Sequence, residues 1–139
     1  MKTILHLIEK AGGYRREFYL RIENPPYMAL VIEAIPEPGP LGSPGISVAH
    51  YGEQNGDLMR DPEMCFELTK ALLSAPALVP YYWRNDYLGI EQFSRSLMGD
   101  RYVFHPGLYE QHERFAAVWD RNLRAQGFLE AFEQRRTAS

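Results

Sequence analysis

Alternating apolar and charged residues in segment 17–23 constrain the fold more than any other feature of this sequence. Phe18, Leu20 and Ile22 point to one side of an extended chain, and the charged residues of the segment point mainly to the other. This period-two pattern is typical of a strand with one buried face. Four later segments predict further strands: residues 28–35, 46–51, 62–69 and 78–84. The chain is therefore expected to form a sheet that packs one face on a core.

Turn-forming residues separate these segments. Asn55-Gly56 is the strongest turn signal, because both residues tolerate a positive φ angle. Residues 36–45, PEPGPLGSPG, predict a loop, and their glycine spacing does not fit a dinucleotide-binding fingerprint. Residues 85–98 fit either a helix or the return strand of a hairpin. Short connections between successive strands favour hairpins and an antiparallel sheet.

Helical periodicity occurs at both ends of the chain. Ile4, Leu7 and Ile8 fall on one face of a short helix, for which Thr3 is the expected cap and Gly12-Gly13 the end. A long helix is expected to begin at Pro106 and to stop at Gly127 in a left-handed conformation. Its apolar face comprises Leu108, Phe115, Trp119 and Leu123.

These elements predict one α+β domain over residues 1–139. It has a single antiparallel sheet of five or six strands, with the N-terminal helix and the long C-terminal helix on one face. Residues 129–136 add a final helical turn or two, and residues 137–139 form a frayed tail.

Composition limits the class of protein. The 139 residues are 45% hydrophobic, which suffices for a packed core. The formal charge of −3 argues against a mainly electrostatic grip on nucleic acid or lipid. The lone Cys65 rules out an internal disulfide and a cysteine-based zinc site, and we expect it to be a packed side chain. With no membrane span or signal sequence apparent, a cytoplasmic protein is expected.

Reactive side chains are densest in residues 50–63, which span a strand end, a turn and the next strand start. Asn85 and Asp86 lie at another strand end and are expected to join them. The candidate polar site comprises His50, Tyr51, Glu53, Asn55, Asp57, Arg60, Asp61, Asn85 and Asp86. Its histidine and carboxylates are residue types that bind divalent metals or divide acid and base roles.

A structural explanation of the same residues stays open. Asn, Gly and Asp are also what a tight connection requires, and Arg60 can neutralise either Asp57 or Asp61. His50 alternates with apolar residues and fits a core histidine, and His112 likewise fits a packing role. No established metal-binding or nucleophile motif is present, so no cofactor, metal or catalytic residue is assigned.

Two motifs, residues 46–64 (ISVAHYGEQNGDLMRDPEM) and 84–89 (RNDYLG), resemble an uncharacterised bacterial domain family of plasmids, integrative elements and phage-like islands. Residues 119–128, WDRNLRAQGF, also resemble the closing helix of that family. Together the motifs cover most of the chain from Met28 to Phe128. The resemblance implies an accessory protein of a mobile element, and it implies no activity or catalytic residue.

Three functional hypotheses follow. The favoured one is a small protein-binding module that acts through the sheet face or the loop around Glu53–Asp61 and is not assigned an enzymatic activity; its partner is another protein, with a homodimer as one option. The second is a metal-dependent hydrolase or nuclease that uses His50, Glu53, Asp57 and Asp61, with Asp86 in support. The third is a nucleic-acid binder that stacks bases on its aromatic residues, with Arg15, Arg16 and Arg21 on phosphates.

Overall fold

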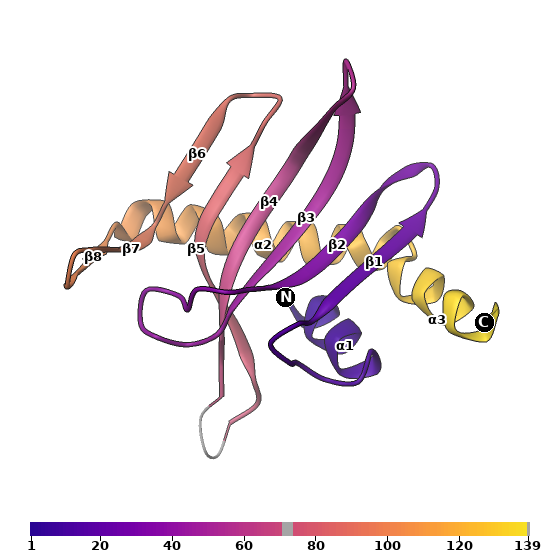
Figure 1. The fold of residues 1–139 in the computed structure, drawn as a ribbon, viewed down its shortest axis with the longest axis horizontal. Helices are drawn as coiled ribbons and strands as arrows, with labels where there is room; N and C mark the ends of the chain where they lie inside the picture. The colour runs from indigo at the N-terminus through magenta and orange to yellow at the C-terminus, as the bar shows by residue number, and fades with distance from the viewer. Residues whose placement is uncertain (71–73, 139) are drawn as a thin grey trace.

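The computed structural model describes residues 1–70 and 74–138 (Figure 1). The described helices are α1 (Lys2–Lys10), α2 (Pro106–Ala125) and α3 (Phe128–Ala138). The described strands are β1 (Tyr19–Asn24), β2 (Tyr27–Ile35), β3 (Gly45–Gln54), β4 (Asp57–Thr69), β5 (Ala77–Asn85), β6 (Ile90–Phe93), β7 (Arg95–Met98) and β8 (Arg101–Phe104). No helix in the described ranges combines the length and apolar character that a membrane crossing requires.

Strands β1 to β6 form one antiparallel sheet in which each strand pairs with the next in sequence. This confirms the expected α+β fold and a sheet of six strands. The expectation of a single sheet was wrong, because β7 and β8 pair only with each other and form a separate hairpin. The segment 85–98 therefore contains strands: β6 returns antiparallel to β5 and leads into β7.

The hairpin of β3 and β4 is longer than the sequence predicted. Asn55 and Gly56 adopt φ angles of 54° and 84°, so a tight turn lets the two strands pair as far as Gln54 and Asp57. Pro62, expected to begin a strand, lies inside β4 next to a register shift opposite His50. A proline cannot donate to the ladder, and an irregularity accommodates it there. Most of segment 50–63 is therefore sheet rather than loop.

One hydrophobic core joins the sheet to the helices. Alternate strand residues such as Leu30, Val48 and Phe66 are fully buried, and they pack in one cluster with residues of α1, α2 and α3. Trp119 and Leu123 of α2 belong to this cluster, and Figure 1 shows α2 crossing behind the strands. We call this side the helix-covered face and the opposite side the open face.

The helix ends differ in part from those predicted by the sequence. Thr3 was expected to cap α1, but it lies inside the helix, where its backbone N–H donates to Asp120 Oδ1 at 2.9 Å. The Asp120 carboxylate of α2 thus accepts a hydrogen bond from a backbone N–H in the first turn of α1. Gly127, with φ 86°, separates α2 from α3 as expected. Helix α3 extends to Ala138, and the last residue of the predicted tail, Ser139, lies outside the described residues.

The Pro/Gly-rich segment 36–44 covers part of the open face. Backbone N–H groups of Leu41 and Ser43 each donate to Glu67 Oε2 at 3.1 Å. Gly39 packs so closely that a Cβ atom there would lie 2.0 Å from Glu67 Cγ. Glu67, which alternation places on the outward side, is therefore buried under this loop.

Arg95 completes this buried arrangement from β7. Its Nη1 atom lies 2.6 Å from Glu67 Oε1, and both side chains are almost fully buried. Its Nε and Nη2 atoms donate to the carbonyls of Pro80 and Val79 at 3.0 and 3.1 Å. A single guanidinium thus ties β4, β5 and the β7–β8 hairpin together.

Candidate functional site

The predicted polar residues separate into three places. One group joins a network on the open face between β4 and β5, a second packs on the helix-covered side, and a third lies at the tip of the β3–β4 hairpin.

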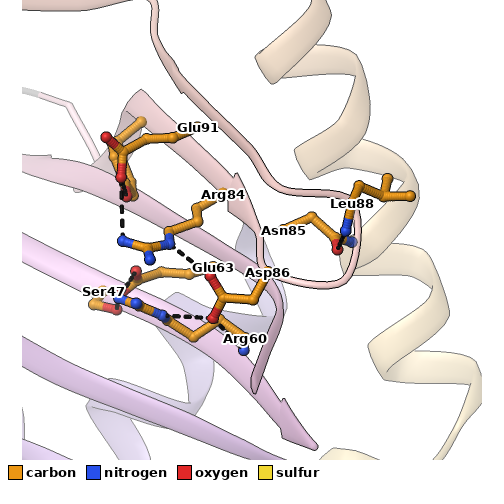
Figure 2. Close-up of polar contacts among 9 residues, drawn as sticks. Ser47, Arg60, Glu63, Arg84, Asn85, Asp86, Leu88 and Glu91 are labelled. Carbon is orange, nitrogen blue, oxygen red and sulfur yellow. Dashed lines mark hydrogen bonds and ion pairs between the residues drawn. The ribbon is translucent and has the colours of Figure 1, made fainter. Parts of the chain in front are cut away.

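Asp86 is the centre of the group on the open face (Figure 2). Its Oδ2 atom accepts from the backbone N–H and the Nε of Arg60 at 2.8 and 3.1 Å. Its Oδ1 atom accepts from Arg84 Nε at 2.7 Å, and its own N–H donates to the carbonyl of Arg60 at 2.9 Å. The turn after β5 is thereby fastened to the first half of β4.

Further side chains extend this contact in both directions. Arg60 Nη1 lies 3.3 Å from Glu63 Oε1, and the Ser47 hydroxyl donates to Glu63 Oε2 at 2.6 Å. On the other side, Glu91 Oε2 accepts from Arg84 Nη1 at 3.1 Å and from the Tyr82 hydroxyl at 2.7 Å. We call the whole set the polar network; it comprises Ser47, Arg60, Glu63, Tyr82, Arg84, Asp86 and Glu91.

The charges of the polar network stabilise one another. Burial acts to raise the pKa of Asp86, but hydrogen bonds from Arg60 and Arg84 outweigh it and lower that pKa to about 2. Burial acts to lower the pKa of Arg60, but the hydrogen bond to Asp86 and the charge of Glu63 raise it overall. The hydrogen bond to Asp86 is also the main cause of a raised pKa at Arg84. These groups stay ionised at neutral pH, so none of them gains or loses a proton there.

Two other residues of the open face lie near the same charges. Burial and the charge of Glu63 raise the pKa of Glu33, and burial with the same charge raises that of Tyr51. Cys65 is buried, as expected, and burial raises the pKa of its thiol. A neutral thiol is a poor nucleophile, so Cys65 fits a packing role.

His50 lies in the core on the helix-covered face. Its ring lies 5.5 Å from that of Trp119 and 5.6 Å from that of Phe128, measured between centroids. Nδ1 lies 3.1 and 3.3 Å from the carbonyl oxygens of Met28 and Ala29, which places the ring proton on that nitrogen. Burial lowers the pKa of His50.

Asn85 and Asp61 form a second pair apart from the polar network. Asn85 Nδ2 donates to Asp61 Oδ1 at 2.6 Å, and Asn85 Oδ1 accepts from the Leu88 N–H at 3.1 Å. Figure 2 shows Asn85 directed away from Asp86 and toward Leu88. This pair shapes the turn between β5 and β6.

Glu53, Asn55 and Asp57 lie at the exposed tip of the β3–β4 hairpin. The four residues of the hydrolase hypothesis are therefore distributed over the core, the tip and the Asn85 contact. Within residues 1–70 and 74–138, no group of three or more His, Cys, Asp or Glu side chains is arranged to hold a metal ion.

Sequence reasoning did not single out several members of the polar network: Ser47, Glu63, Tyr82, Arg84 and Glu91. The sequence carries a signal for two of them. Strand alternation places Ser47 and Glu63 on the face of the sheet that lies away from the core residues Val48 and Met64. The contact of Arg84 with Asp86 and Glu91 depends on the register between β5 and β6, which local sequence does not reveal.

His112 of α2 is buried, as expected for a packing histidine. Its Nδ1 lies 2.8 Å from Ser94 Oγ, and its Nε2 lies 3.1 Å from Gln92 Oε1. Burial lowers the pKa of His112 to about 4, so the ring is neutral at pH 7. These contacts attach α2 to β6, through Gln92, and to Ser94 between β6 and β7.

Comparison with protein families gives one match, which covers residues 2–129 and is described as a domain of unknown function (DUF6908). In the comparisons with curated proteins and with solved structures, nothing matches the chain. The match spans all the described strands and both α1 and α2. The chain thus belongs to an uncharacterised domain family, the domain of unknown function DUF6908.

Proposed function

We propose that the protein is a protein-binding module without enzymatic activity, and that the β7–β8 hairpin is its binding element. The observation that carries this proposal is the exposed apolar surface of the hairpin and its surroundings. Phe93, Leu97, Met98, Tyr102 and Phe104 are between 42% and 67% exposed. Apolar side chains gathered in this way on a soluble domain are typical of interaction sites.

The hairpin presents these side chains in an ordered way. Leu97 and Tyr102 are cross-strand neighbours, so they share one face of the hairpin. The rings of Tyr102 and Phe104 are stacked with centroids 6.4 Å apart, and Tyr109 packs edge-on against Phe104 at 5.5 Å. Since aromatic rings supply much of the binding energy in protein interfaces, this face suits a protein partner.

The free edge of β8 adds a backbone contact. The N–H of His105 donates to the carbonyl of Ser94 at 2.9 Å, which continues the ladder between β8 and β7. Residues alternate in an antiparallel ladder, so the N–H groups of Tyr102 and Phe104 face away from β7. Among the described strands, none pairs with that outer edge. A partner strand added there gains hydrogen bonds as well as apolar contact.

The partner we propose is a second copy of the chain. Two β8 edges that meet antiparallel form a closed, two-fold symmetric pair. If the outward groups of Tyr102 meet those of Phe104 in the second copy, the two aromatic side chains become cross-strand neighbours. The result is a four-stranded sheet across the dimer, with both apolar faces on the same side.

Sedimentation velocity from low micromolar to several hundred micromolar protein tests the proposal. We expect a dimer of the 16.1-kDa chain, and Tyr102→Lys is expected to leave a folded monomer because a charge on an edge strand opposes pairing. Leu58→Lys is the matched control, since Leu58 is also an exposed apolar strand residue, 67% exposed against 42% for Tyr102, but lies near the β3–β4 tip. A wild-type monomer throughout the range, or dissociation by Leu58→Lys, would contradict the proposal.

The proposal also includes a setting, that of a cytoplasmic accessory protein of a bacterial mobile element. The resemblance of the 46–64 and 84–89 motifs supports this setting. Sequencing of the genes that flank the coding sequence tests it: plasmid-transfer, integrase or phage genes are expected there, and a conserved housekeeping operon would contradict it.

A further inference from the structure

A hollow of about 590 Å³ lies where the end of α1, the turn that follows it, β1 and α3 meet. Three cationic side chains, those of Lys10, Arg15 and Arg135, line it together with the aromatic residues Phe18, Tyr19 and Phe132. No aspartate or glutamate lines it. We call this site the basic hollow; it is remote in sequence from the β7–β8 hairpin and independent of it.

The cations of the basic hollow are unpaired. Among the described residues, no carboxylate lies within ion-pair distance of Lys10, Arg15 or Arg135. Arg15 is held instead against the ring of Phe18, with its guanidinium carbon 5.6 Å from the ring centroid. This cation–π contact positions the charge without neutralising it. In a protein with a net charge of −3, such a cluster attracts anions locally.

Free carbonyl groups at the C-terminal end of a helix would repel an anion, but three of the last carbonyls of α1 already accept hydrogen bonds. The carbonyls of Leu7, Ile8 and Glu9 accept from the N–H groups of Ala11, Gly13 and Gly12 at 3.0, 2.9 and 3.1 Å. Gly12 and Gly13 make this possible with φ angles of 106° and 88°. The partial negative charge of the helix terminus is thereby reduced, and Lys10 in the last turn offsets what remains.

We propose that the basic hollow binds a polyphosphate anion, with the phosphate groups on the three cations. Guanidinium groups bind phosphate oxygens through paired, charge-assisted hydrogen bonds, and an ammonium group adds a point charge. The volume falls in the range of small-molecule sites, about 300–1,000 Å³.

Calorimetric titration of the full chain at low salt tests this assignment with three probes: ATP, inorganic tripolyphosphate and adenosine. We expect ATP and tripolyphosphate both to bind, because each carries three linked phosphate groups, and adenosine to give no measurable heat. Arg15→Gln and Arg135→Gln are each expected to weaken both anions about tenfold, through lost charge-assisted hydrogen bonds.

Arg121→Gln is the matched control, because Arg121 is exposed and unpaired among the described residues but lies outside the basic hollow. Urea unfolding of each variant shows whether the fold is retained. No binding of either anion, or an equal loss in Arg121→Gln, overturns the site. If adenosine binds as tightly as ATP does, the assignment to phosphate groups is overturned.

Discussion

The polar network and the basic hollow both contain arginines, but only the polar network supplies them with carboxylates. Arg60 and Arg84 share Asp86 and reach Glu63 and Glu91 on either side. Arg15 and Arg135 line a hollow without any acidic residue. The same side chain therefore closes contacts within the sheet in one region and leaves charge available to a ligand in the other.

This difference has a physical basis in desolvation. A charge that is buried needs a partner, and removal of that partner leaves an uncompensated charge in a medium of low dielectric. An exposed cation remains hydrated, so lack of a partner has little effect on the free energy of unfolding. Substitutions of paired arginines should therefore affect stability, whereas those of unpaired arginines should affect binding.

The largest effect is expected at the buried pair of Glu67 and Arg95. Arg95→Met leaves Glu67 buried without its cation and frees the carbonyls of Val79 and Pro80. We expect the free energy of unfolding to fall by about 3–5 kcal/mol, as urea denaturation followed by circular dichroism would measure. A loss of less than about 1 kcal/mol would mean that this pair does not hold the hairpin to the sheet.

The next largest effect is expected on acidification. It should lower stability through the buried histidines, whereas the exposed cations keep their charge. The folded-state pKa of His112 is lowered from 6.5 to about 4, and that of His50 is also lowered. Between those values the unfolded chain binds protons that the folded chain does not, so stability falls as pH drops from 6.5 toward 4.

The fall attributable to His112 is on the order of 2–3 kcal/mol. Urea denaturation at intervals of pH would measure it, with His112→Gln as the comparison. This variant should flatten the profile in that window, since it cannot titrate. An unchanged slope would contradict the role of His112.

A smaller effect is expected at the centre of the polar network. Asp86→Asn removes the charge that Arg60 and Arg84 share, and both arginines are about one-third exposed, so water offsets part of the loss. We expect a decrease of about 1–2 kcal/mol in the free energy of unfolding at pH 7.

The pKa of Asp86 gives this prediction a second readout. Because the folded-state pKa is lowered from 3.8 to about 2, the contribution of Asp86 is present above pH 3.8 and is lost as pH falls toward 2. The difference between wild type and Asp86→Asn should therefore shrink over that window. A constant difference would indicate that the variant acts through packing instead of charge.

The smallest effect on stability is expected in the basic hollow. Arg15→Gln and Arg135→Gln should each change the free energy of unfolding by less than about 0.5 kcal/mol, because neither cation has a carboxylate partner among the described residues. Urea denaturation beside Asp86→Asn makes the comparison direct. A loss as large as that of Asp86→Asn would place these arginines in a structural role.

Local sequence predicted a strand or a turn well where the conformation depends on the residues of that segment alone. Alternation at Phe18, Leu20 and Ile22 identified the buried side of β1, and Asn55-Gly56 identified the β3–β4 turn. The structure differs from the sequence prediction where a residue contacts an element distant in sequence. Thr3 receives its contact from Asp120 of α2, and Glu67 is buried by segment 36–44 and Arg95.

The candidate site shows the same limit. Arg60 and Asp86 were singled out and do meet, but His50 and Glu53 do not join them. These residues were grouped because they are close in sequence. In the structure, the pleat of β3 directs His50 to the other face, and the length of the β3–β4 hairpin places Glu53 at its tip. Neither property follows from the composition of residues 50–63.

The most direct test of the contrast is a titration of ¹⁵N-labelled protein with tripolyphosphate, followed by backbone amide chemical shifts. We expect saturable shifts at residues 10–15, Tyr19 and Arg135, with the amides of Arg60 and Asp86 unmoved. Shifts centred on Arg60 and Arg84, or spread over all exposed cations, would show that pairing does not distinguish the two regions.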